Sequence, residues 1–271
     1  MKYFRKYFLD LFRSKFSGRK RFQKFFNLTR NLSVQGLNFG NGSSINLSGE
    51  IGLLKTLNKK FVEPRKYIIF DVGANQGDYC TEVLNNLKVN DLEIWCFEPS
   101  LTTFQMLQVN HSDKNNVYLN QIGFSDTNED LPLFTQGEGA HIASLYPLER
   151  AFGAEKKLSQ FELVSVKKID DFVRDNNIPY IDLLKLDIEG NELRALSGAR
   201  ALLNNGQIKA IQFEFGTCNI DSRTYFRDFW HLLSDKYNIY RLLKDGRHPV
   251  TYYSEYDEVF ATINYFAELK S

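Results

Sequence analysis

The chain of 271 residues is 43% hydrophobic and 14% aromatic, which is enough apolar material for one large packed α/β domain or two small ones. Its formal net charge of +1 excludes a chain-wide polycation that would coat nucleic acid, and no apolar stretch reaches the roughly 18–20 residues of a membrane-spanning helix. Three cysteines, Cys80, Cys96 and Cys218, form no C-x-x-C pair, which indicates reduced thiols in a cytoplasmic protein. The basic N-terminus lacks the uninterrupted apolar core of a secretory signal.

The first 30 residues combine basic and aromatic side chains. They hold ten Lys and Arg against one acid, Asp10, whereas the rest of the chain holds 24 Lys and Arg against 32 Asp and Glu. Apolar residues recur there at helical spacing, at Phe4, Phe8, Leu11 and Phe12. Residues 1–32 are therefore predicted to form an amphipathic helical segment. It would contact either an anionic membrane, at its inner face, or a protein surface on the domain or a partner subunit. The acidic remainder argues against a nucleic-acid partner.

Residues 33–66 are predicted to lead into a main domain over residues 67–271. Ser33–Gly49 is rich in Gly, Asn and Ser and is expected to be irregular. A helix over Glu50–Lys59 then precedes the first strand, with Glu50 in its first turn, where the helix dipole favours an acid.

The stretch from Tyr67 to Tyr79 predicts a strand, a glycine turn and a helix. Tyr67–Phe70 is a short apolar run typical of a strand buried on both faces, and Asp71 ends it. Gly73 and Gly77 let the backbone turn sharply, so that a ligand can approach the N-terminus of the following helix. The G-x-x-x-G spacing differs from the G-x-G-x-x-G of dinucleotide folds, which disfavours a nicotinamide-dependent oxidoreductase.

A second acid follows the next predicted strand, Leu92–Phe97. Glu98 ends that strand together with Pro99, which cannot continue the ladder. A carboxylate at the tip of the strand beside Asp71 suits a ribose diol. Two carboxylates around one pocket would repel a pyrophosphate and attract a ligand that is cationic near its ribose, such as S-adenosylmethionine.

The middle of the chain contains a third strand and an insertion. Leu101–Asn110 is predicted as a helix and Val117–Phe124 as a strand, at whose end Ile122 either contacts an adenine or simply packs in the core. The segment of about 129–165 breaks the alternation with two strand-like runs and is predicted to be a hairpin-like insertion. It carries a lone histidine, His141, which is either a base or, as is commoner in loops, a solvated side chain.

The C-terminal half continues the alternation of helices and strands. Helices are expected at Ile169–Asn176, Asn191–Leu203 and Tyr225–Asp235, and strands at Ile181–Leu186, Ile208–Phe215, Asn238–Leu243 and Tyr256–Ile263. This order predicts an α/β fold with a doubly wound, mainly parallel, seven-stranded sheet and an antiparallel edge strand. Asp187 and Glu189 follow the fourth strand, and Glu214 lies near the end of the fifth.

Three motifs in this order resemble the FkbM family of S-adenosylmethionine-dependent O-methyltransferases. They are DVGANQGDY from Asp71, FEPS from Phe97 and KLDIEGNE from Lys185, and the resemblance covers roughly Glu50 to Gly216. It implies a class I, Rossmann-like methyltransferase fold. It also implies S-adenosylmethionine as cofactor and, as acceptor, a hydroxyl on a glycan or secondary metabolite.

The resemblance and the fold together assign the site residues. The cofactor is expected to be bound by Asp71, Gly73, Asn75, Gly77, Glu98, Ile122 and, less favoured than its helix-dipole role, Glu50. Since a hydroxyl needs a base or a metal ion, the catalytic candidates are Asp187, Glu189 and His141. Asp187 is preferred as the base, and the alternative is that it caps the following helix with Glu189 in the first turn. A divalent cation held by Asp187 and Glu214 is not favoured, because the sequence indicates no dense cluster of acids.

Other functions remain open at this point. One is a non-catalytic nucleotide-binding or membrane-scaffold protein that keeps the fold, and another is a methyltransferase that acts on RNA or protein. The oligomeric state is not predicted.

Overall fold

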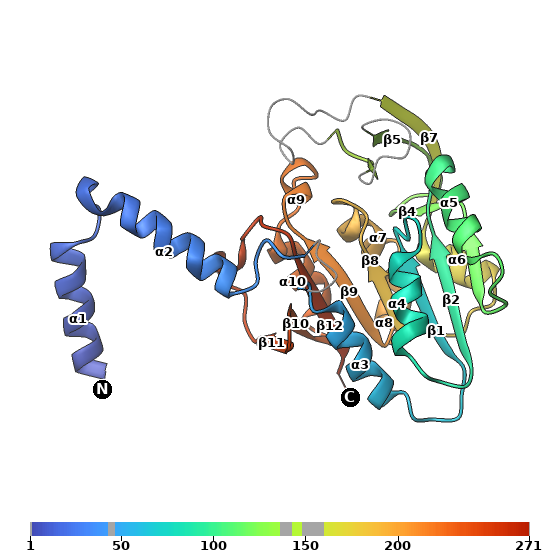
Figure 1. Ribbon diagram of the computed structural model, residues 1–271, viewed down its shortest axis with the longest axis horizontal. Helices are drawn as coiled ribbons and strands as arrows, with labels where there is room; N and C mark the ends of the chain where they lie inside the picture. The colour runs from blue at the N-terminus through green and yellow to red at the C-terminus, as the bar shows by residue number, and fades with distance from the viewer. Residues whose placement is uncertain (1, 43–46, 136–142, 148–159, 271) are drawn as a thin grey trace.

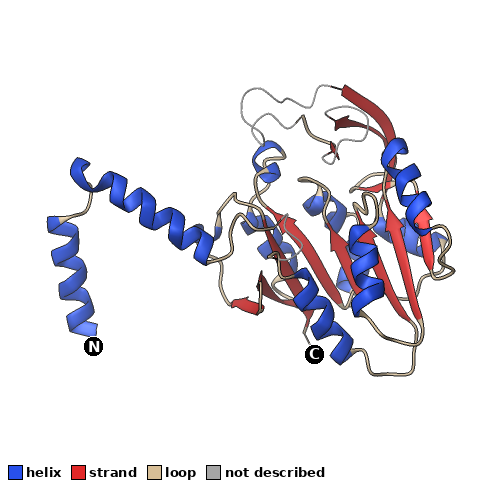
Figure 2. Cartoon of the chain, in the orientation of Figure 1, coloured by secondary structure: helices blue, strands red, loops and turns tan. Residues whose placement is uncertain are grey.

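The computed structural model describes residues 2–42, 47–135, 143–147 and 160–270. Figure 1 shows a three-layer domain with a small sheet above one edge and a helical arm that projects from the opposite side. Helices cover both faces of the larger sheet (Figure 2). Among the described residues, no helix is both long and apolar enough to cross a bilayer.

The larger sheet has the strand order β11-β10-β12-β9-β8-β1-β2-β3 in the described chain. Its strands are β1 (Tyr67–Val72), β2 (Leu92–Phe97), β3 (Val117–Asn120), β8 (Leu183–Leu186), β9 (Ala210–Phe215), β10 (Tyr237–Leu243), β11 (Gly246–Val250) and β12 (Ile263–Leu269). The strands from β3 to β9 pair in parallel, whereas β12 runs antiparallel to its neighbours β9 and β10. The predicted doubly wound, mainly parallel sheet with an antiparallel edge is confirmed.

An eighth strand, β11, extends the seven that were expected. It pairs antiparallel with β10 at the edge of the sheet and contains Pro249. Proline lacks the amide hydrogen that a central strand needs, so the sequence around Pro249 did not indicate a strand. An edge strand accommodates proline, because one of its sides has no neighbouring strand.

Two layers of helices bury the two faces of the sheet. One face is covered by α3 (Glu50–Lys60), α4 (Asp78–Asn86) and α5 (Leu101–His111), and the other by α6 (Ile169–Asp175), α7 (Glu192–Ser197), α8 (Arg200–Asn204) and α10 (Phe226–Leu233). Along β1, Ile68 and Phe70 enter one core while Tyr67 and Ile69 enter the other. The side-chain alternation of a strand thus explains why all six residues of β1 are buried.

The insertion forms a second, four-stranded sheet with the order β4-β7-β5-β6. Its strands are β4 (Gly123–Phe124), β5 (Glu129–Thr135), β6 (Ala143–Ser144) and β7 (Gln160–Lys167). The antiparallel pairing of β5 with β7 confirms the predicted hairpin. The expected single strand over 117–124 is wrong, since the chain leaves the large sheet after β3 and β4 pairs with β7 instead.

Two further elements differ from the expectation. The predicted helix Asn191–Leu203 is divided at Gly198, where an added Cβ would lie 2.1 Å from the carbonyl oxygen of Ser125. The last strand begins at Ile263 rather than at Tyr256, because Ser254 and Asp257 form a capping box around the short helix η2 (Glu255–Asp257). One further short helix, α9 (Cys218–Asp221), follows β9.

The N-terminal arm consists of α1 (Lys2–Lys15), η1 (Lys20–Phe22) and α2 (Gln23–Gly36). The helix α2 continues into the segment that was expected to be irregular. Immediately after it, Phe39 is buried in the main core and the side-chain amide of Asn38 donates to the carbonyl of Leu242. The arm is therefore fastened to the domain at the end of α2.

Candidate active site

A pocket lies at the carboxyl ends of β1, β2 and β8, beneath the small sheet. From these strand ends it is lined by Val72, Gly73, Asn75, Phe97, Glu98, Pro99, Asp187, Ile188, Glu189 and Asn191, and from the small sheet by Gly123, Phe124, Leu133, Ala143, Leu145 and Val166. Ligands bind outside the carboxyl ends of the strands in open α/β sheets, so this is the expected place for a substrate site.

Gly73 allows β1 and β8 to meet at the floor of the pocket. Its φ is 77°, and an added Cβ would lie 1.9 Å from the carbonyl oxygen of Asp187. No other residue fits both that backbone conformation and that contact. The glycine thereby places the turn after β1 directly beside Asp187.

Glu98 is held in place by the backbone around it. Its two carboxylate oxygens accept hydrogen bonds from the backbone N–H groups of Asn75, at 3.1 Å, and Ser100, at 3.0 Å. The side chain is almost fully buried, and this burial raises the pKa of Glu98 to about 7, while the two backbone hydrogen bonds oppose the rise. Each oxygen keeps further acceptor capacity for a ligand hydroxyl.

The opposite wall of the pocket is apolar. Phe124, Leu133 and Val166 are all buried and bring the small sheet against the strand ends. Gly123 leaves this wall flat, since an added Cβ would lie 3.2 Å from a Val166 methyl. A flat apolar wall beside a fixed carboxylate suits a purine ring attached to a ribose.

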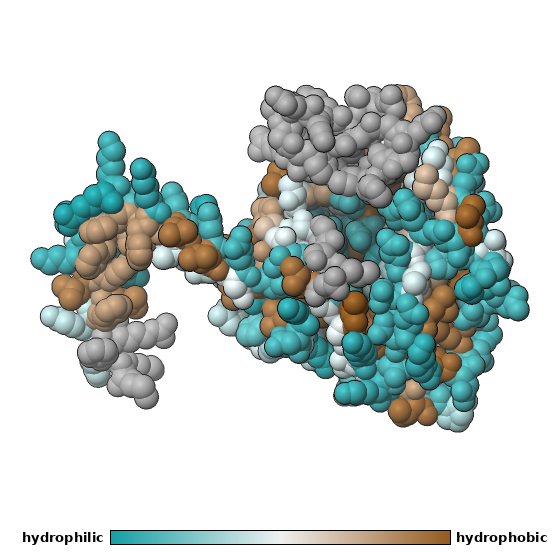
Figure 3. Space-filling view, in the orientation of Figure 1, coloured by the Kyte–Doolittle hydropathy of each residue, from teal (hydrophilic) through white to brown (hydrophobic). Residues whose placement is uncertain are grey.

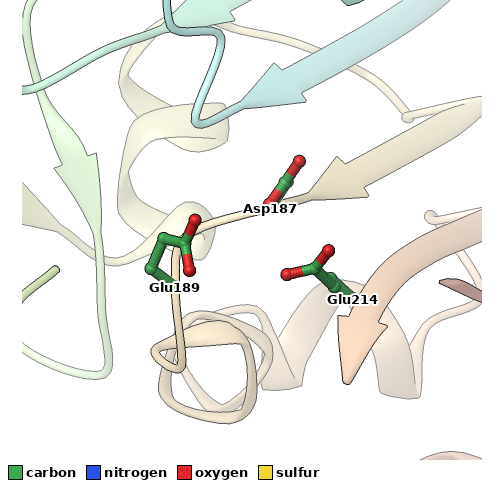
Figure 4. Close-up of side chains that lie close together, drawn as sticks. All are labelled: Asp187, Glu189 and Glu214. Atoms are coloured by element: carbon green, nitrogen blue, oxygen red, sulfur yellow. The ribbon is translucent and has the colours of Figure 1, made fainter. Parts of the chain in front are cut away.

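Three carboxylates converge where Asp187 and Glu189 line the pocket. Asp187 follows β8, Glu189 lies on the next turn, and Glu214 belongs to β9; Figure 4 shows their carboxylates pointing toward one another. One ligand oxygen from each lies within 4.8 Å of the others. The expectation that the acids would not cluster is therefore wrong. Groups this close together can share protons or hold a hard cation.

Burial and mutual repulsion set the charge of this acid cluster of Asp187, Glu189 and Glu214. Burial and the neighbouring Asp187 raise the pKa of Glu189, whose carboxylate accepts a hydrogen bond from the Cys218 thiol at 2.8 Å. Burial first, and then Asp187 and Glu189, raise the pKa of Glu214 well above its usual range. Asp187 differs from both, because its side chain is 40% exposed and lies 3.6 Å from the Lys185 ammonium.

The comparisons with known proteins agree with this geometry. A family model described as the methyltransferase FkbM domain matches residues 71–242. The chain belongs to the FkbM methyltransferase family. The family resemblance drawn from the three motifs is thereby confirmed, and so is the methyltransferase function.

Individual relatives are more distant. The chain is 26% identical over 174 residues to hexuronic acid methyltransferase AglP of Haloferax volcanii, in a match that spans 63% of this chain and 64% of that relative. A solved FkbM methyltransferase of Methylobacillus flagellatus has 21% identity and a TM-score of 0.46, over 79% of this chain and 47% of that one. An O-methyltransferase from Bacillus cereus in complex with SAH has 10% identity and a TM-score of 0.43, over 96% of each chain.

In this FkbM methyltransferase, several predicted site residues line the pocket together. They are Gly73, Asn75, Glu98, Asp187 and Glu189. Ile122 is instead half-buried against the main core, and Gly77 packs on His111, whose ring would lie 2.3 Å from an added Cβ. His141 lies outside the described residues.

Asp71 lies beneath the pocket rather than on its surface. Its carboxylate accepts a hydrogen bond from the Lys185 ammonium at 3.1 Å, and both side chains are buried. Burial raises the pKa of Asp71 while Lys185 opposes the rise. Through this pair and its 3.6 Å approach to Asp187, Lys185 links the two strand ends.

Glu50 belongs to a second buried polar chain under the site. Its carboxylate accepts hydrogen bonds from Ser48, at 2.9 Å, and from the side-chain amide of Gln212, at 2.7 Å, while Tyr79 donates to Gln212. Burial raises the pKa of Glu50, and Lys185 counteracts the rise. Glu50 is in the first turn of α3, as expected. Its carboxylate accepts its hydrogen bonds from side chains of the protein itself.

The proposed capping role of Asp187 is wrong. The helix α7 begins at Glu192, with Asn191 at its N-cap, and the carboxylate of Glu192 accepts the backbone N–H groups of Ile188 and Gly190. Glu192 therefore shapes the turn that carries Asp187 and Glu189. The sequence reasoning assigned it no role, although its place in the KLDIEGNE motif was the available signal.

Proposed function

We propose that this methyltransferase transfers a methyl group from S-adenosylmethionine to a hydroxyl group of a glycan. The single observation that supports this most is the carboxylate of Glu98, fixed by two backbone N–H groups in a pocket that is also lined by an apolar wall and by Asp187 and Glu189. These three features complement the ribose, the adenine and the cationic sulfonium of S-adenosylmethionine.

The residues present fit that cofactor in chemistry. Glu98 would accept hydrogen bonds from the ribose hydroxyls, and Phe124 and Val166 would face the adenine. The acid cluster would attract the positive charge of the sulfonium. When bound, S-adenosylmethionine supplies a methyl group that its sulfonium already activates.

Asp187 is the residue that we assign to proton removal. A hydroxyl is a weak nucleophile at neutral pH and needs a base within hydrogen-bond reach. Asp187 lines the pocket with a side chain that is 40% exposed, and it lies within ion-pair distance of Lys185. Raised pKa values keep Glu189 and Glu214 more protonated, so their carboxyl groups would orient Asp187 and the acceptor.

The acceptor class follows from the base and from one relative. Only a hydroxyl acceptor needs a base such as Asp187, since a carboxylate is already ionised at neutral pH. The relative AglP is named a hexuronic acid methyltransferase, which supports a sugar as the acceptor. A hydroxyl of a secondary metabolite satisfies the argument from the base but not the argument from this relative.

The test is transfer of labelled methyl from S-adenosylmethionine into fractionated cell extract, with the labelled product identified by mass. We expect label in a glycan fraction that survives mild alkali, since a methyl ether is stable where a methyl ester is hydrolysed. Alkali-labile label would contradict the hydroxyl assignment. Calorimetry should also detect binding of S-adenosylmethionine and no binding of NAD. Tight NAD binding would contradict the cofactor assignment.

A further inference from the structure

The N-terminal arm, residues 2–36, projects away from the domain and exposes large apolar side chains. Nine large aromatic or aliphatic side chains between Tyr3 and Leu32 are exposed, and neither η1 nor α2 has a buried residue. Figure 1 shows both helices of the arm projecting beyond the sheet layers. The arm contributes nothing to the pocket described above, so its surface needs a separate explanation.

The arm has an internal core that fixes its shape. Phe12 contacts Phe26 and Phe16 contacts Phe22, with ring centroids 5.7 and 5.2 Å apart. These rings join α1 to η1 and α2, which leaves the other aromatic residues on the outside. Phe16 is still 41% exposed and Phe25, which contacts Phe26, is 59% exposed, so this internal core leaves much of the arm's apolar surface open.

On α2 the exposed apolar residues form one stripe. Phe25, Leu28 and Leu32 are spaced by three and four residues, which places them on one side of the helix, and each is close to 60% exposed. On α1, Tyr7 and Leu11 are separated by four residues and lie beside Phe8. Figure 3 shows apolar residues gathered on the arm, with hydrophilic ones along its edge.

The arm is also strongly basic. Eight of its Lys and Arg side chains are described, and all are exposed: Lys6, Arg13, Lys15, Arg19, Lys20, Arg21, Lys24 and Arg30. Among the described residues of the arm, Arg13 pairs with Asp10 at 4.0 Å. The rest of the chain carries more acids than bases, so the positive charge is concentrated here.

We propose that the arm lies on an anionic lipid bilayer, with the stripe of Phe25, Leu28 and Leu32 inserted between the headgroups. Exposed aromatic and aliphatic side chains beside a basic face are the pattern of helices that lie in a membrane interface. The cores of protein–protein interfaces are instead depleted in lysine. Anionic headgroups supply the charge that complements the arm. The attachment at Asn38 and Phe39 holds the domain next to that surface.

The experiment is co-sedimentation of the full-length protein with vesicles of phosphatidylcholine, alone or mixed with phosphatidylglycerol. We expect binding to the mixed vesicles, and a loss of roughly tenfold or more in affinity when the salt concentration rises from low to several times physiological, because salt screens the attraction. Two variants separate the contributions: F25S/L28S/L32S removes the stripe, and K20E/R21E/K24E reverses the charge. Both change exposed positions, and each should abolish sedimentation with vesicles.

Matched controls use exposed positions outside the arm. V109S/L163S removes two side chains that are 84% and 71% exposed, and K55E/K59E reverses two charges on α3. These controls should bind vesicles as the unmodified protein does. Absence of binding to the mixed vesicles, or equal loss in variants and controls, would overturn the proposal. A lipid-free dimer that the arm variants dissociate would overturn it in favour of a second copy of the chain.

Discussion

The two halves of the pocket hold their acids in opposite ways. At the ends of β1 and β2, the carboxylate of Glu98 receives two backbone N–H groups, and the charges of Glu162 and Asp71 raise its pKa less than burial does. At the ends of β8 and β9, Asp187, Glu189 and Glu214 approach within 4.8 Å of one another. The carboxylate of Glu98 already has hydrogen-bond donors before any ligand arrives. The three clustered carboxylates instead repel one another, and a cation, a proton or a substrate relieves that repulsion. The comparison teaches that cofactor binding depends on the ends of β1 and β2, whereas proton removal depends on the ends of β8 and β9. Four predictions test this division.

The largest effect is expected at the chemical half. Asp187→Asn keeps the shape of the side chain but removes its ability to take a proton, so turnover should fall by on the order of a hundredfold or more while the fold is retained. The measurement is labelled methyl transfer at saturating cofactor. Asp235→Asn, which changes an exposed acid outside the pocket, should keep full turnover. Full activity in Asp187→Asn would show that Asp187 is not the base.

At the binding half, affinity should depend on pH through Glu98. Its pKa in the free protein is about 7, and the ionised form is the better acceptor for ribose hydroxyls. Affinity for S-adenosylhomocysteine should therefore be constant above about pH 7 and fall below it, by up to about tenfold per pH unit. Calorimetry over a pH series measures this, and Glu98→Gln should bind weakly and show a flat profile. A sloping profile in Glu98→Gln would assign the titration to another group.

The turn between the halves should influence stability in a defined direction. Burial raises the pKa of Glu192 to about 8, so the folded protein keeps a proton that the unfolded chain loses above about pH 4.5. The stability from this group is complete below that pH and is lost as the pH rises toward 8. Glu192→Gln mimics the protonated acid, so its melting temperature should fall less between pH 5.5 and 8.5 than that of the wild type, by roughly a few degrees. Identical slopes would show that Glu192 does not titrate in this way.

The smallest effect is expected from metal removal. If Asp187 acts as a base, EDTA should leave the wild-type rate within about twofold, since no step requires a cation. Methyl transfer measured with and without EDTA checks this. Loss of activity that Mg²⁺ restores would mean that the acid cluster relieves its repulsion with a cation, and the role of Asp187 would become that of a ligand.

The sequence predicted the residues at the strand ends better than the contacts of buried side chains under the pocket, such as Asp71. Gly73, Glu98 and Asp187 line one pocket, and each was expected at a strand end because it comes at or just after the end of an apolar run. Asp71 was expected beside the ligand because it directly follows the apolar run Tyr67–Phe70. The strand continues to Val72, so the alternation of β1 turns Asp71 toward Lys185 instead.

The sequence suggested Asp187 and Glu214 as joint ligands of a cation, but it did not show that Glu189 completes a cluster with them. Glu189 and Glu214 belong to separate elements, and only the parallel pairing of β8 with β9 brings them together. The same holds for Gln212, which reaches Glu50 across the domain. Such contacts depend on the tertiary fold, whereas glycine turns and strand-ending prolines are local signals.

One measurement tests the division between the two halves most directly. It is the dissociation constant of S-adenosylhomocysteine for the wild type, Asp187→Asn and Glu98→Ala at one pH above 7. The wild type and Asp187→Asn should agree within about twofold, because S-adenosylhomocysteine lacks the sulfonium charge that the acid cluster would attract. Glu98→Ala should bind more weakly by about 1.5–3 kcal/mol, the cost of losing hydrogen bonds to a charged acceptor. Equal affinity in all three proteins, or equal weakening in both variants, would contradict the account.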